Sequence, residues 1–341
     1  MHPAPASPPE EFASALERWF AAHRKDYPWR RTRDPYAILV AEVMLQQTQI
    51  TTVLDRGFYA RWLERFPTFT ALAAAPEEDV LRTWEGLGYY RRARNLQKLA
   101  QVVAAEHGGL MPANPALILA LPGIGPYTAG AVASFAFDLP EPIVDGNVAR
   151  VLARVFNDPT PVDSTEGQKR LWERAGVLVR AATRPGDFNS ALMELGQTHC
   201  RTGQPACSRC PVSAFCRATD PAALPVKGKR TAITEVTERV YFLHHGDGVL
   251  LEQETGSRRT GLWKLPALPE GDARLPPVLH KMTYGITRYK VTLWVHAPPP
   301  SPALTAAHRM IGEADLASLP MPAPYRKALN IVLRAKEFRL E

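Results

Sequence analysis

Apolar residues recur every three or four positions through the first two thirds of the chain, which is the spacing of one face of an α-helix. A first helix is predicted from about Glu10, and a second over residues 34–45, where Asp34-Pro35 supplies an N-cap and a proline at the first helical position. Further helices are predicted over residues 53–66, 76–84, 129–137, 165–179 and 188–199. We find no convincing strand pattern before residue 230, so the first domain is predicted to be all-α.

The pattern changes after residue 230. Residues 235–243, 249–251 and 289–296 alternate as strands do, and a last helix is predicted over 325–338, so the second domain is predicted to be α+β. The composition of residues 218–232 is that of a linker, and residues 1–9 hold four prolines without periodicity. The predicted organisation is a disordered tail at 1–9, an all-α domain at 10–217, a linker at 218–232 and a smaller α+β domain at 233–341.

Composition narrows the class of protein. The chain has 341 residues, of which 45% are hydrophobic and 22% charged, as in a soluble globular protein of two domains. It contains neither a run of 18 apolar residues nor an N-terminal secretory pattern, so we expect a cytoplasmic protein without a membrane partner. The net charge of +7 agrees with a polyanionic partner, although proteins that never touch nucleic acid also carry such a charge.

All the cysteines lie in one short stretch, with the spacing Cys-x6-Cys-x2-Cys-x5-Cys. They are Cys200, Cys207, Cys210 and Cys216. Disulfides are disfavoured because no leader precedes them and a chain of this length does not need them. Zinc modules usually carry two Cys-x2-Cys pairs, so one pair with unequal arms favours an iron–sulfur cluster. Residues 199–230 also carry +5 of the net charge, which predicts salt-sensitive contact with a phosphate backbone.

Two glycine-containing turns are candidates for DNA contact. In Leu121-Pro-Gly-Ile-Gly125, Gly123 and Gly125 lie between two predicted helices and would let backbone amides approach a phosphate, as in a helix-hairpin-helix. A simple tight turn is the alternative. Residues 86–94 carry two tyrosines and three arginines, suited to stacking on bases and pairing with phosphates. The alternative there is a helix N-terminus with a solvated basic face.

Two acidic residues are candidates for chemistry. Glu42 is the one charged residue in the apolar run 38–45, and it is either exposed on a solvent face or held in a cleft. Asp145 stands at the predicted N-terminus of a helix, 22 residues after Gly123. Capping alone would explain an aspartate there. The residues by themselves leave both questions open.

Taken together and in this order, the motifs resemble the MutY-type adenine DNA glycosylases of the endonuclease III, or helix-hairpin-helix, superfamily. The segments that carry the resemblance are residues 42–49, 86–90, 121–125 and 144–148 and the four cysteines, within a likeness over roughly residues 10–341. The resemblance implies an all-α helix-hairpin-helix glycosylase domain with a loop holding one 4Fe-4S cluster. It also implies a smaller α+β domain like the nucleotide (Nudix) hydrolases, without their acidic helix and therefore without pyrophosphatase activity.

The resemblance implies base excision repair of double-stranded DNA. A flipped adenine, mispaired with 8-oxoguanine or guanine, would be released by hydrolysis of its N-glycosidic bond, leaving an abasic site. Such a reaction needs a proton on the leaving base and a negative charge beside an oxocarbenium-like sugar. By family match, Glu42 protonates adenine N7, and Asp145 stabilises the sugar cation directly or through a covalent adduct. Tyr127 and Asn147 position the sugar or water, and Tyr127 replaces the lysine with which related enzymes cut the strand.

Other roles follow from the family match alone. Trp29 and Arg30 would line the adenine pocket, while Gln47 and Tyr89 would fill the gap and meet the opposite base, with packing or surface contact as the alternative for each. The remaining expected DNA contacts are Gln46 and Gln49, Gly123 and Gly125, and Tyr284. In Tyr284-Gly285-Ile286 the chain departs from the Phe-Ser-His that is frequent in the family, so two hydrogen bonds to 8-oxoguanine are lost. A monovalent or divalent cation at the hairpin and a monomeric state are further expectations.

Two other functions stay open from the sequence. One is a bifunctional pyrimidine-lesion glycosylase and lyase of the endonuclease III kind, against which Tyr127 and the domain after residue 230 both speak. The other is a non-catalytic DNA-binding module stabilised by zinc.

Overall fold

The computed structural model describes residues 8–228, 232–256, 259–268, 275–302 and 304–337. The chain forms two compact units. The helical unit comprises Met1–Tyr59, Phe66–Ala73 and Lys98–Arg230, and the mixed unit comprises Ala60–Arg65, Ala74–Gln97 and Thr231–Glu341. Residues 1–7 of the predicted tail, 229–231 of the predicted linker and the predicted helix end at Phe338 lie outside the described residues. Within those residues, none of the helices is long and apolar enough to cross a membrane.

The part of the chain before residue 230 is helical where it is described, as predicted. Its α-helices are α1 (Pro9–His23), α2 (Pro35–Leu45), α3 (Ile50–Asp55), α4 (Phe58–Arg65), α5 (Phe69–Ala74), α6 (Glu77–Thr83), α7 (Arg91–Glu106), α8 (Pro115–Ala120), α9 (Pro126–Phe137), α10 (Gly146–Val155), α11 (Thr165–Arg180) and α12 (Pro185–Thr198). Short 3-10 helices are η1 (Pro28–Arg30), η2 (Cys207–Arg209) and η3 (Ser213–Phe215). The single helix predicted over 53–66 is wrong, because Gly57 adopts φ +64° and separates α3 from α4.

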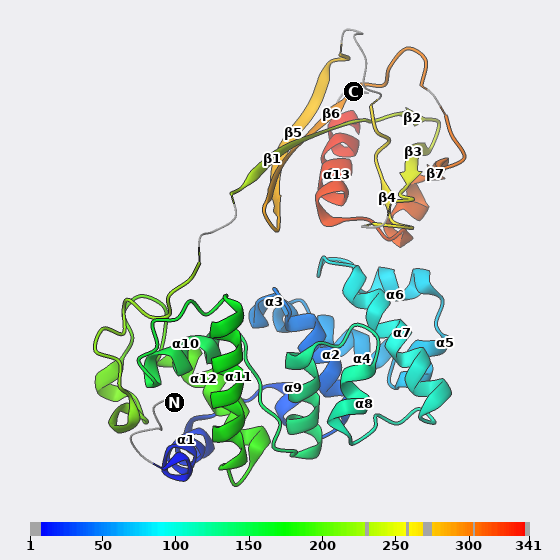
Figure 1. Ribbon diagram of the computed structural model, residues 1–341. Helices are drawn as coiled ribbons and strands as arrows, with labels where there is room; N and C mark the ends of the chain where they lie inside the picture. Colours follow the sequence, from blue (N-terminus) through cyan, green and yellow to red (C-terminus); the bar gives the residue numbers. More distant parts are fainter. Residues whose placement is uncertain (1–7, 229–231, 257–258, 269–274, 303, 338–341) are drawn as a thin grey trace. The chain divides into compact units, whose positions relative to one another are not determined.

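In the helical unit, α12 lies among α1, α9, α10 and α11 (Figure 1). Apolar side chains from these helices share one buried cluster, which includes Phe12, Leu16, Val151, Leu152, Leu178, Phe188 and Leu192. Each such side chain contributes roughly 1.5–3 kcal/mol when fully buried. Glycine permits a close approach between α12 and α10, because a Cβ on Gly196 would lie 2.7 Å from Asn147 Cβ. The core therefore fixes the start of α10 against α12.

A second contact joins α2 to α9. The N-cap Asp34 accepts hydrogen bonds from the amides of Tyr36 and Ala37, at 3.0 and 3.3 Å, and so begins α2 as predicted. Nine successive residues of α2, from Tyr36 to Met44, are buried. A helix that is apolar on every side and buried on every side leaves no solvent face. Glu42 is therefore carried into the interior of the helical unit.

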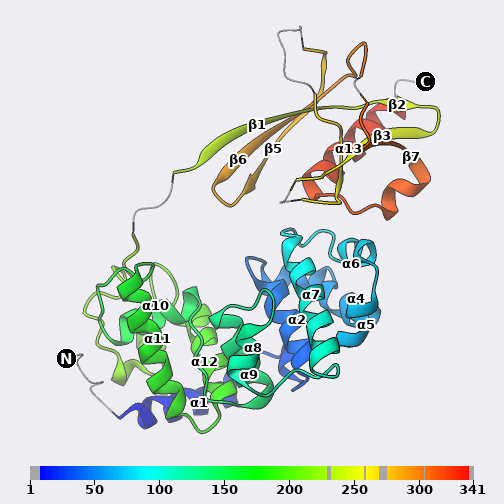
Figure 2. The same cartoon turned by 45° about the vertical axis from the view of Figure 1, so that its right-hand side comes forward.

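The mixed unit contains two small sheets and one long helix. Strand order β1-β6-β5 forms sheet A, from β1 (Thr234–Tyr241), β5 (Val278–Ile286) and β6 (Tyr289–His296). Sheet B contains β2 (His244–His245), β3 (Gly248–Gln253), β4 (Trp263–Lys264) and β7 (His308–Gly312), and the 3-10 helix η4 (Glu313–Ser318) precedes α13 (Ala323–Glu337). Figure 2 shows α13 beside sheet A, and it contacts β5. The predicted α+β class is confirmed, whereas β2, β4, β5 and β7 were not predicted.

Pairing in sheet A separates its two faces. β1 and β6 are parallel, with Glu238 opposite Leu293, and β5 is antiparallel to β6, with Tyr284 opposite Val291. The side chains of Val291, Leu293 and Val295 are buried in one core with residues of α13. Because opposite residues share a face, Glu238 and Tyr284 also point toward that core.

Candidate active site

The centre of the site is Glu42, which is only 6% exposed. The phenol of Tyr127, in the first turn of α9, donates a hydrogen bond of 2.9 Å to Glu42 Oε2. The same phenol oxygen lies 3.8 Å from Met193 Sδ on α12. The sequence left open whether Glu42 is exposed to solvent or enclosed, and the structure shows that it is enclosed.

Asp145 is the N-cap of α10. Its Oδ1 accepts the amide of Val148 at 2.7 Å, and its Oδ2 accepts Asn147 Nδ2 at 2.8 Å. The capping interpretation is thus correct, but it leaves further lone pairs on both carboxylate oxygens. The carboxylate is consequently held in one orientation by two bonds.

Electrostatics link the two acids. Burial raises the pKa of Glu42 to about 7, the Tyr127 hydrogen bond opposes this, the charge of Asp145 raises it further and the charge of Arg30 lowers it. Burial also raises the pKa of Tyr127 well above its ordinary value, and the charges of Glu42 and Asp145 add to that effect. Both acids therefore act on the same phenol, which puts them around one site. An acid with a pKa near neutrality is suited to proton donation at physiological pH.

Arg30 and Trp29 both belong to η1, and the charge of Arg30 acts on Glu42. The guanidinium of Arg30 forms an ion pair with Glu194, donates to the carbonyl of Lys25 at 3.0 Å and lies 4.9 Å from the Tyr27 ring centroid. The Trp29 ring stacks on Tyr27 at 5.2 Å. Arg30 therefore lies within electrostatic reach of Glu42, while the expected place of both residues in an adenine pocket stays a prediction.

Glu194 was not singled out from the sequence. It is 1% exposed and accepts both Arg30 and the backbone amide of Lys25, the latter at 3.0 Å. It follows Met193 on α12, so adjacent residues of one helix contact Tyr127 and Arg30. The signal was the same as for Glu42, namely one acidic residue inside an apolar helical run, Ala191-Leu-Met-Glu-Leu195.

The predicted hairpin is present between α8 and α9. Asn114 caps α8 by accepting the amides of Ala116 and Leu117, at 2.9 and 3.3 Å. Gly123 has φ +77°, which favours glycine, and Gly125 is the N-cap of α9. A Cβ added to Gly125 would meet nothing within 4 Å. The turn therefore offers open backbone beside the positive end of a helix dipole.

The glutamines after α2 lie at the end of its buried run. Gln46 is the C-cap residue of α2 and half-buried, while Gln47 and Gln49 are exposed. Gln47 adopts φ +57°, an uncommon conformation for a residue other than glycine. Such conformations are retained where the surrounding structure imposes them, often at functional sites.

Tyr89 belongs to the mixed unit. It is 43% exposed, has φ +48°, and its ring centroid lies 5.5 Å from the guanidinium of Arg92. Arg91 begins α7, so the helix N-terminus of the alternative for residues 86–94 is present, although Arg92 and Arg94 are only half-exposed. The expected contact of Tyr89 with a base stays a prediction.

The side chain of Tyr284 is half-buried and hydrogen-bonded within the mixed unit. Its hydroxyl donates to Glu238 Oε2 at 2.6 Å and accepts from Arg259 at 3.3 Å, and its ring packs against the core beneath sheet A. Burial, and then the hydrogen bond to Glu238, raises its pKa above its ordinary value. Its expected contact with DNA stays a prediction, and the structure adds that the side chain already has protein partners.

The four cysteines occupy the loop of η2 and η3, and none forms a disulfide. Burial raises the pKa of Cys210 to about 11, and the other three thiols add to the rise, so the four lie near one another. Within the described residues, no group of three or more His, Cys, Asp or Glu side chains is arranged to hold a metal ion. Four neighbouring soft thiols nevertheless form a donor set that suits an iron–sulfur cluster.

Two arginines of α10 connect this loop to the rest of the helical unit. Arg154, 2% exposed, has Nη1 3.3 Å from Cys200 Sγ. Arg150 Nε donates to the carbonyl of Cys200 at 2.7 Å, and its Nη2 donates to Asn147 Oδ1 at 2.9 Å. Because Asn147 in turn donates to Asp145, a continuous series of hydrogen bonds runs from Cys200 to Asp145. The sequence did not reveal this connection.

Residues 40–175 match the family described as HhH-GPD superfamily base excision DNA repair protein. The adenine DNA glycosylase of Mus musculus is 48% identical over 216 residues, which are 61% of this chain and 41% of the mouse protein. That of Buchnera aphidicola is 34% identical over 258 residues, 74% of this chain and 71% of that protein.

Solved structures agree on the helical fold. A thermostable thymine-DNA glycosylase superposes with a TM-score of 0.55 at 32% identity, over 61% of this chain and 95% of that one. The chain spans about two fifths of the length of the mammalian relatives it matches. It spans most of the Buchnera relative, however, and with the family match this shows that the chain belongs to the adenine DNA glycosylases of the HhH-GPD superfamily.

Proposed function

We propose that this protein excises adenine mispaired with 8-oxoguanine or guanine in double-stranded DNA and leaves an abasic site. The observation that carries the proposal is the buried Glu42 carboxyl, with a pKa of about 7, bonded to Tyr127 and within electrostatic reach of Asp145. Its relatives in the family carry the name adenine DNA glycosylase.

The two acids divide the work of breaking the glycosidic bond. Glu42 transfers its proton to N7 of the flipped adenine, so the base leaves as a neutral molecule and Glu42 becomes a carboxylate. The sugar left behind carries positive charge at C1′, and Asp145, oriented by Val148 and Asn147, stabilises it. Water then adds its oxygen to C1′ and releases a proton to solvent, from which Glu42 is protonated again, and this completes hydrolysis.

The residue at position 127 decides whether the strand is also cut. Strand cleavage by the bifunctional relatives needs an amine that attacks C1′ and forms a Schiff base. A tyrosine whose pKa is raised by burial is neutral at physiological pH and already donates to Glu42. The product is therefore expected to be an intact strand with an abasic site.

DNA contact would draw on several separate parts of the chain. The hairpin at Gly123 and Gly125 would bind backbone phosphates, and Gln47 and Tyr89 would contact the exposed bases. The mixed unit, with its resemblance to Nudix domains, would read the base opposite adenine. A cation at the hairpin belongs to this proposal as well.

Cys200, Cys207, Cys210 and Cys216 would hold one 4Fe-4S cluster. Such a cluster gives this loop a rigid, covalently held framework. The chain's own part is then structural, because Arg154 and Arg150 tie Cys200 to α10. The loop would thus help to hold the site rather than take part in the bond-breaking step.

The test is release of adenine under single-turnover conditions from A:8-oxoguanine, A:G and A:T duplexes. We expect release from the first two, with strand breaks only after hot alkali. Glu42→Gln and Asp145→Asn should reduce the rate by at least about 10³-fold, as loss of an essential catalytic group does. The matched control Glu11→Gln changes an exposed carboxylate of α1 and should keep the wild-type rate.

Three outcomes would contradict parts of the proposal. Release from A:T as fast as from A:8-oxoguanine would exclude mispair specificity. Strand breaks without alkali, together with a borohydride-trapped adduct, would indicate the bifunctional alternative. A colourless protein loaded with zinc and without base release would indicate the non-catalytic module.

A further inference from the structure

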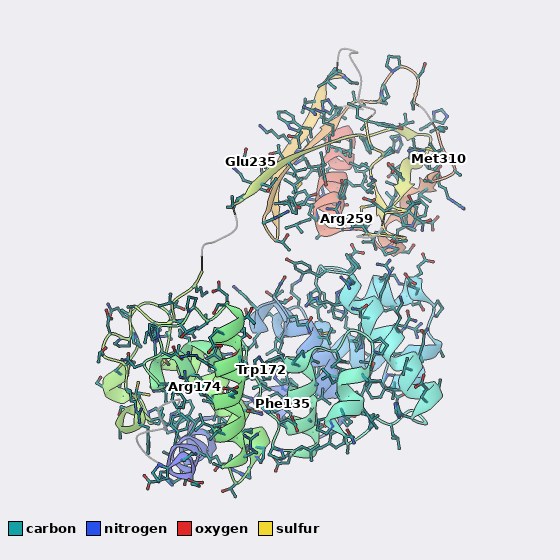
Figure 3. The ribbon with its side chains drawn as sticks, viewed as in Figure 1. Phe135, Trp172, Arg174, Glu235, Arg259 and Met310 are labelled. Carbon is teal, nitrogen blue, oxygen red and sulfur yellow. The ribbon has the colours of Figure 1, made fainter. Side chains whose placement is uncertain are left out.

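The first turn of α13 contacts the side chain of Tyr284 through a shared acceptor. Tyr325 donates a hydrogen bond of 2.8 Å to Glu238 Oε2, and Tyr284 donates to the same oxygen at 2.6 Å. Arg259, labelled in Figure 3, lies with its guanidinium 5.5 Å from the Tyr325 ring centroid and donates to the Tyr284 hydroxyl. Glu238 is thus a common point that fixes β5 to the start of α13.

The next residue of α13 contacts a different segment of the same unit. Arg326 Nε lies 2.8 Å from Glu85 Oε1 and its Nη2 lies 3.2 Å from Glu85 Oε2. The guanidinium also donates to the carbonyls of Leu316 and Leu319. The side chains of Arg326 and Glu85 are 18% and 21% exposed, so this two-pronged pair is largely shielded from solvent.

A second contact with the α13 side lies after the Tyr89 turn, which comprises residues 86–89. The Tyr90 hydroxyl, in a residue 7% exposed, donates to the carbonyl of Met321 at 2.9 Å. Glu85 and Tyr90 therefore bracket residues 86–89. Between them Tyr89 remains 43% exposed.

Residues 86–89 are also held by hydrogen bonds from neighbouring side chains. Arg92 Nη2 donates to the carbonyls of Leu87 and Gly88 at 2.9 and 3.2 Å, and Trp84 Nε1 donates to the Gly88 carbonyl at 3.0 Å. Gly86 and Gly88 have φ +99° and +70°, values that a residue with a Cβ rarely adopts. Motion of the anchors would therefore be passed to Tyr89 rather than absorbed within the turn.

We propose that Tyr325 and Arg326 are positioning residues that determine mispair specificity, because they hold the Tyr284 strand and the Tyr89 turn in one fixed arrangement. This rests on the proposed function, in which both tyrosines meet the DNA near the base opposite adenine. Neither residue of α13 needs to touch DNA. A base that satisfies two contacts at once gains more when their separation is fixed beforehand than when it must be imposed on binding.

The experiment separates positioning from chemistry by changing Glu85, the partner of Arg326 beside the Tyr89 turn. Glu85→Ala removes the bridge but leaves Arg326 its bonds to Leu316 and Leu319. Glu78→Ala is the matched control, an exposed glutamate of α6. Tyr325→Phe removes one donor to Glu238 and nothing else. Affinity is measured with 2′-fluoro-adenosine opposite 8-oxoguanine or guanine, since that sugar resists cleavage, and the adenine-release rate is measured at saturating enzyme.

We expect Glu85→Ala and Tyr325→Phe each to lower the ratio of affinities for the 8-oxoguanine and guanine duplexes by about fivefold, the effect of losing one shielded hydrogen bond. Their release rates from A:8-oxoguanine at saturation should stay within about twofold of wild type. Glu85→Gln, which keeps an acceptor for Arg326, should recover part of the ratio.

An unchanged ratio in both variants, or an equal fall in Glu78→Ala, would overturn the inference. A lower release rate at saturation with an unchanged ratio would also overturn it, by assigning these residues to chemistry or general stability. Failure of the wild-type protein to release adenine at all would instead contradict the proposed function, on which this inference depends.

Discussion

Tyr127 donates its phenolic hydrogen to the Glu42 carboxyl at 2.9 Å across 85 residues of sequence. Burial alone would raise the pKa of Glu42 further, and this bond lowers it, with a net value of about 7. Tyr127 therefore adjusts the acidity of the proposed proton donor rather than acting on the sugar alone. The pKa so set lies close to the pH at which a general acid is most effective.

The first prediction concerns the pH dependence of adenine release. Only protonated Glu42 can donate, and its pKa is about 7, so the single-turnover rate should be nearly constant below pH 6 and fall about tenfold per pH unit well above 7. Rates measured from pH 5.5 to 9 on an A:8-oxoguanine duplex test this. Affinity for the uncleavable duplex over the same range is the control, and a rate that keeps rising to pH 9 would rule out Glu42 as the acid.

The second prediction concerns Tyr127→Phe. The hydrogen bond from Tyr127 lowers the pKa of Glu42, so its loss should raise that pKa and move the falling limb of the rate profile to higher pH. Tyr59→Phe is a matched control, because Tyr59 donates to the carbonyl of Ala37 on the same helix at 3.2 Å. The control should lose some stability and keep the wild-type profile. A Tyr127→Phe profile that moves to lower pH would contradict the assigned direction.

The third prediction is that Glu42 costs stability at neutral and higher pH. The pKa of Glu42 is raised from 4.5 to about 7 in the folded protein, so burying the protonated carboxyl costs little below pH 4.5. As the pH rises from 4.5 to 7 the free energy of unfolding falls, and above 7 the folded protein must bury a carboxylate. Glu42→Gln should therefore stabilise the protein by about 3 kcal/mol at pH 8 and by about 1 kcal/mol or less at pH 5. Urea unfolding at both pH values measures this.

A control variant is needed for these urea-unfolding measurements. Glu11→Gln changes an exposed carboxylate, and surface substitutions usually alter stability by no more than about 0.5 kcal/mol. Equal stabilisation by Glu42→Gln at pH 5 and pH 8 would show that its gain comes from packing and not from ionisation.

The sequence predicted features that depend on residues close together along the chain. The cap at Asp34, the turn at Gly123 and the strand patterns of β1, β3 and β6 depend on neighbours along the chain, and these were predicted correctly. Burial of Glu42 was left open, because it depends on α9 and α12 as well as α2. The bond that lowers its pKa comes from Tyr127, which no local pattern connects to it.

Pairings distant in sequence could not be predicted. Arg326 and Glu85 are 241 residues apart, and either could have been a solvated surface charge. The parallel pairing of β1 with β6 likewise joins segments separated by four other strands. Glu194 did carry a local signal, an acidic residue in an apolar helix, but its partners Arg30 and Lys25 lie more than 160 residues away. Residues of this kind become visible only when the fold brings their partners together.

The last prediction concerns Arg150, which bonds to the carbonyls of Cys200 and Gly196, each at 2.7 Å, and to Asn147 Oδ1 at 2.9 Å. Lysine would keep the charge but cannot reproduce the fork of donors. Arg150→Lys should therefore leave Asn147 and Asp145 less firmly oriented, and we expect adenine release to slow about tenfold or more with DNA affinity changed about threefold at most.

A purely structural role for Arg150 would give a different result. Arg180→Lys, at an exposed position of α11, is the matched control and should keep the wild-type rate. If Arg150 only secured the loop, the variant would lose the visible absorbance of the proposed cluster and the release rate in parallel. If it orients Asp145, fully cluster-loaded Arg150→Lys will still be slow, because the site geometry is lost while the cysteine loop remains intact.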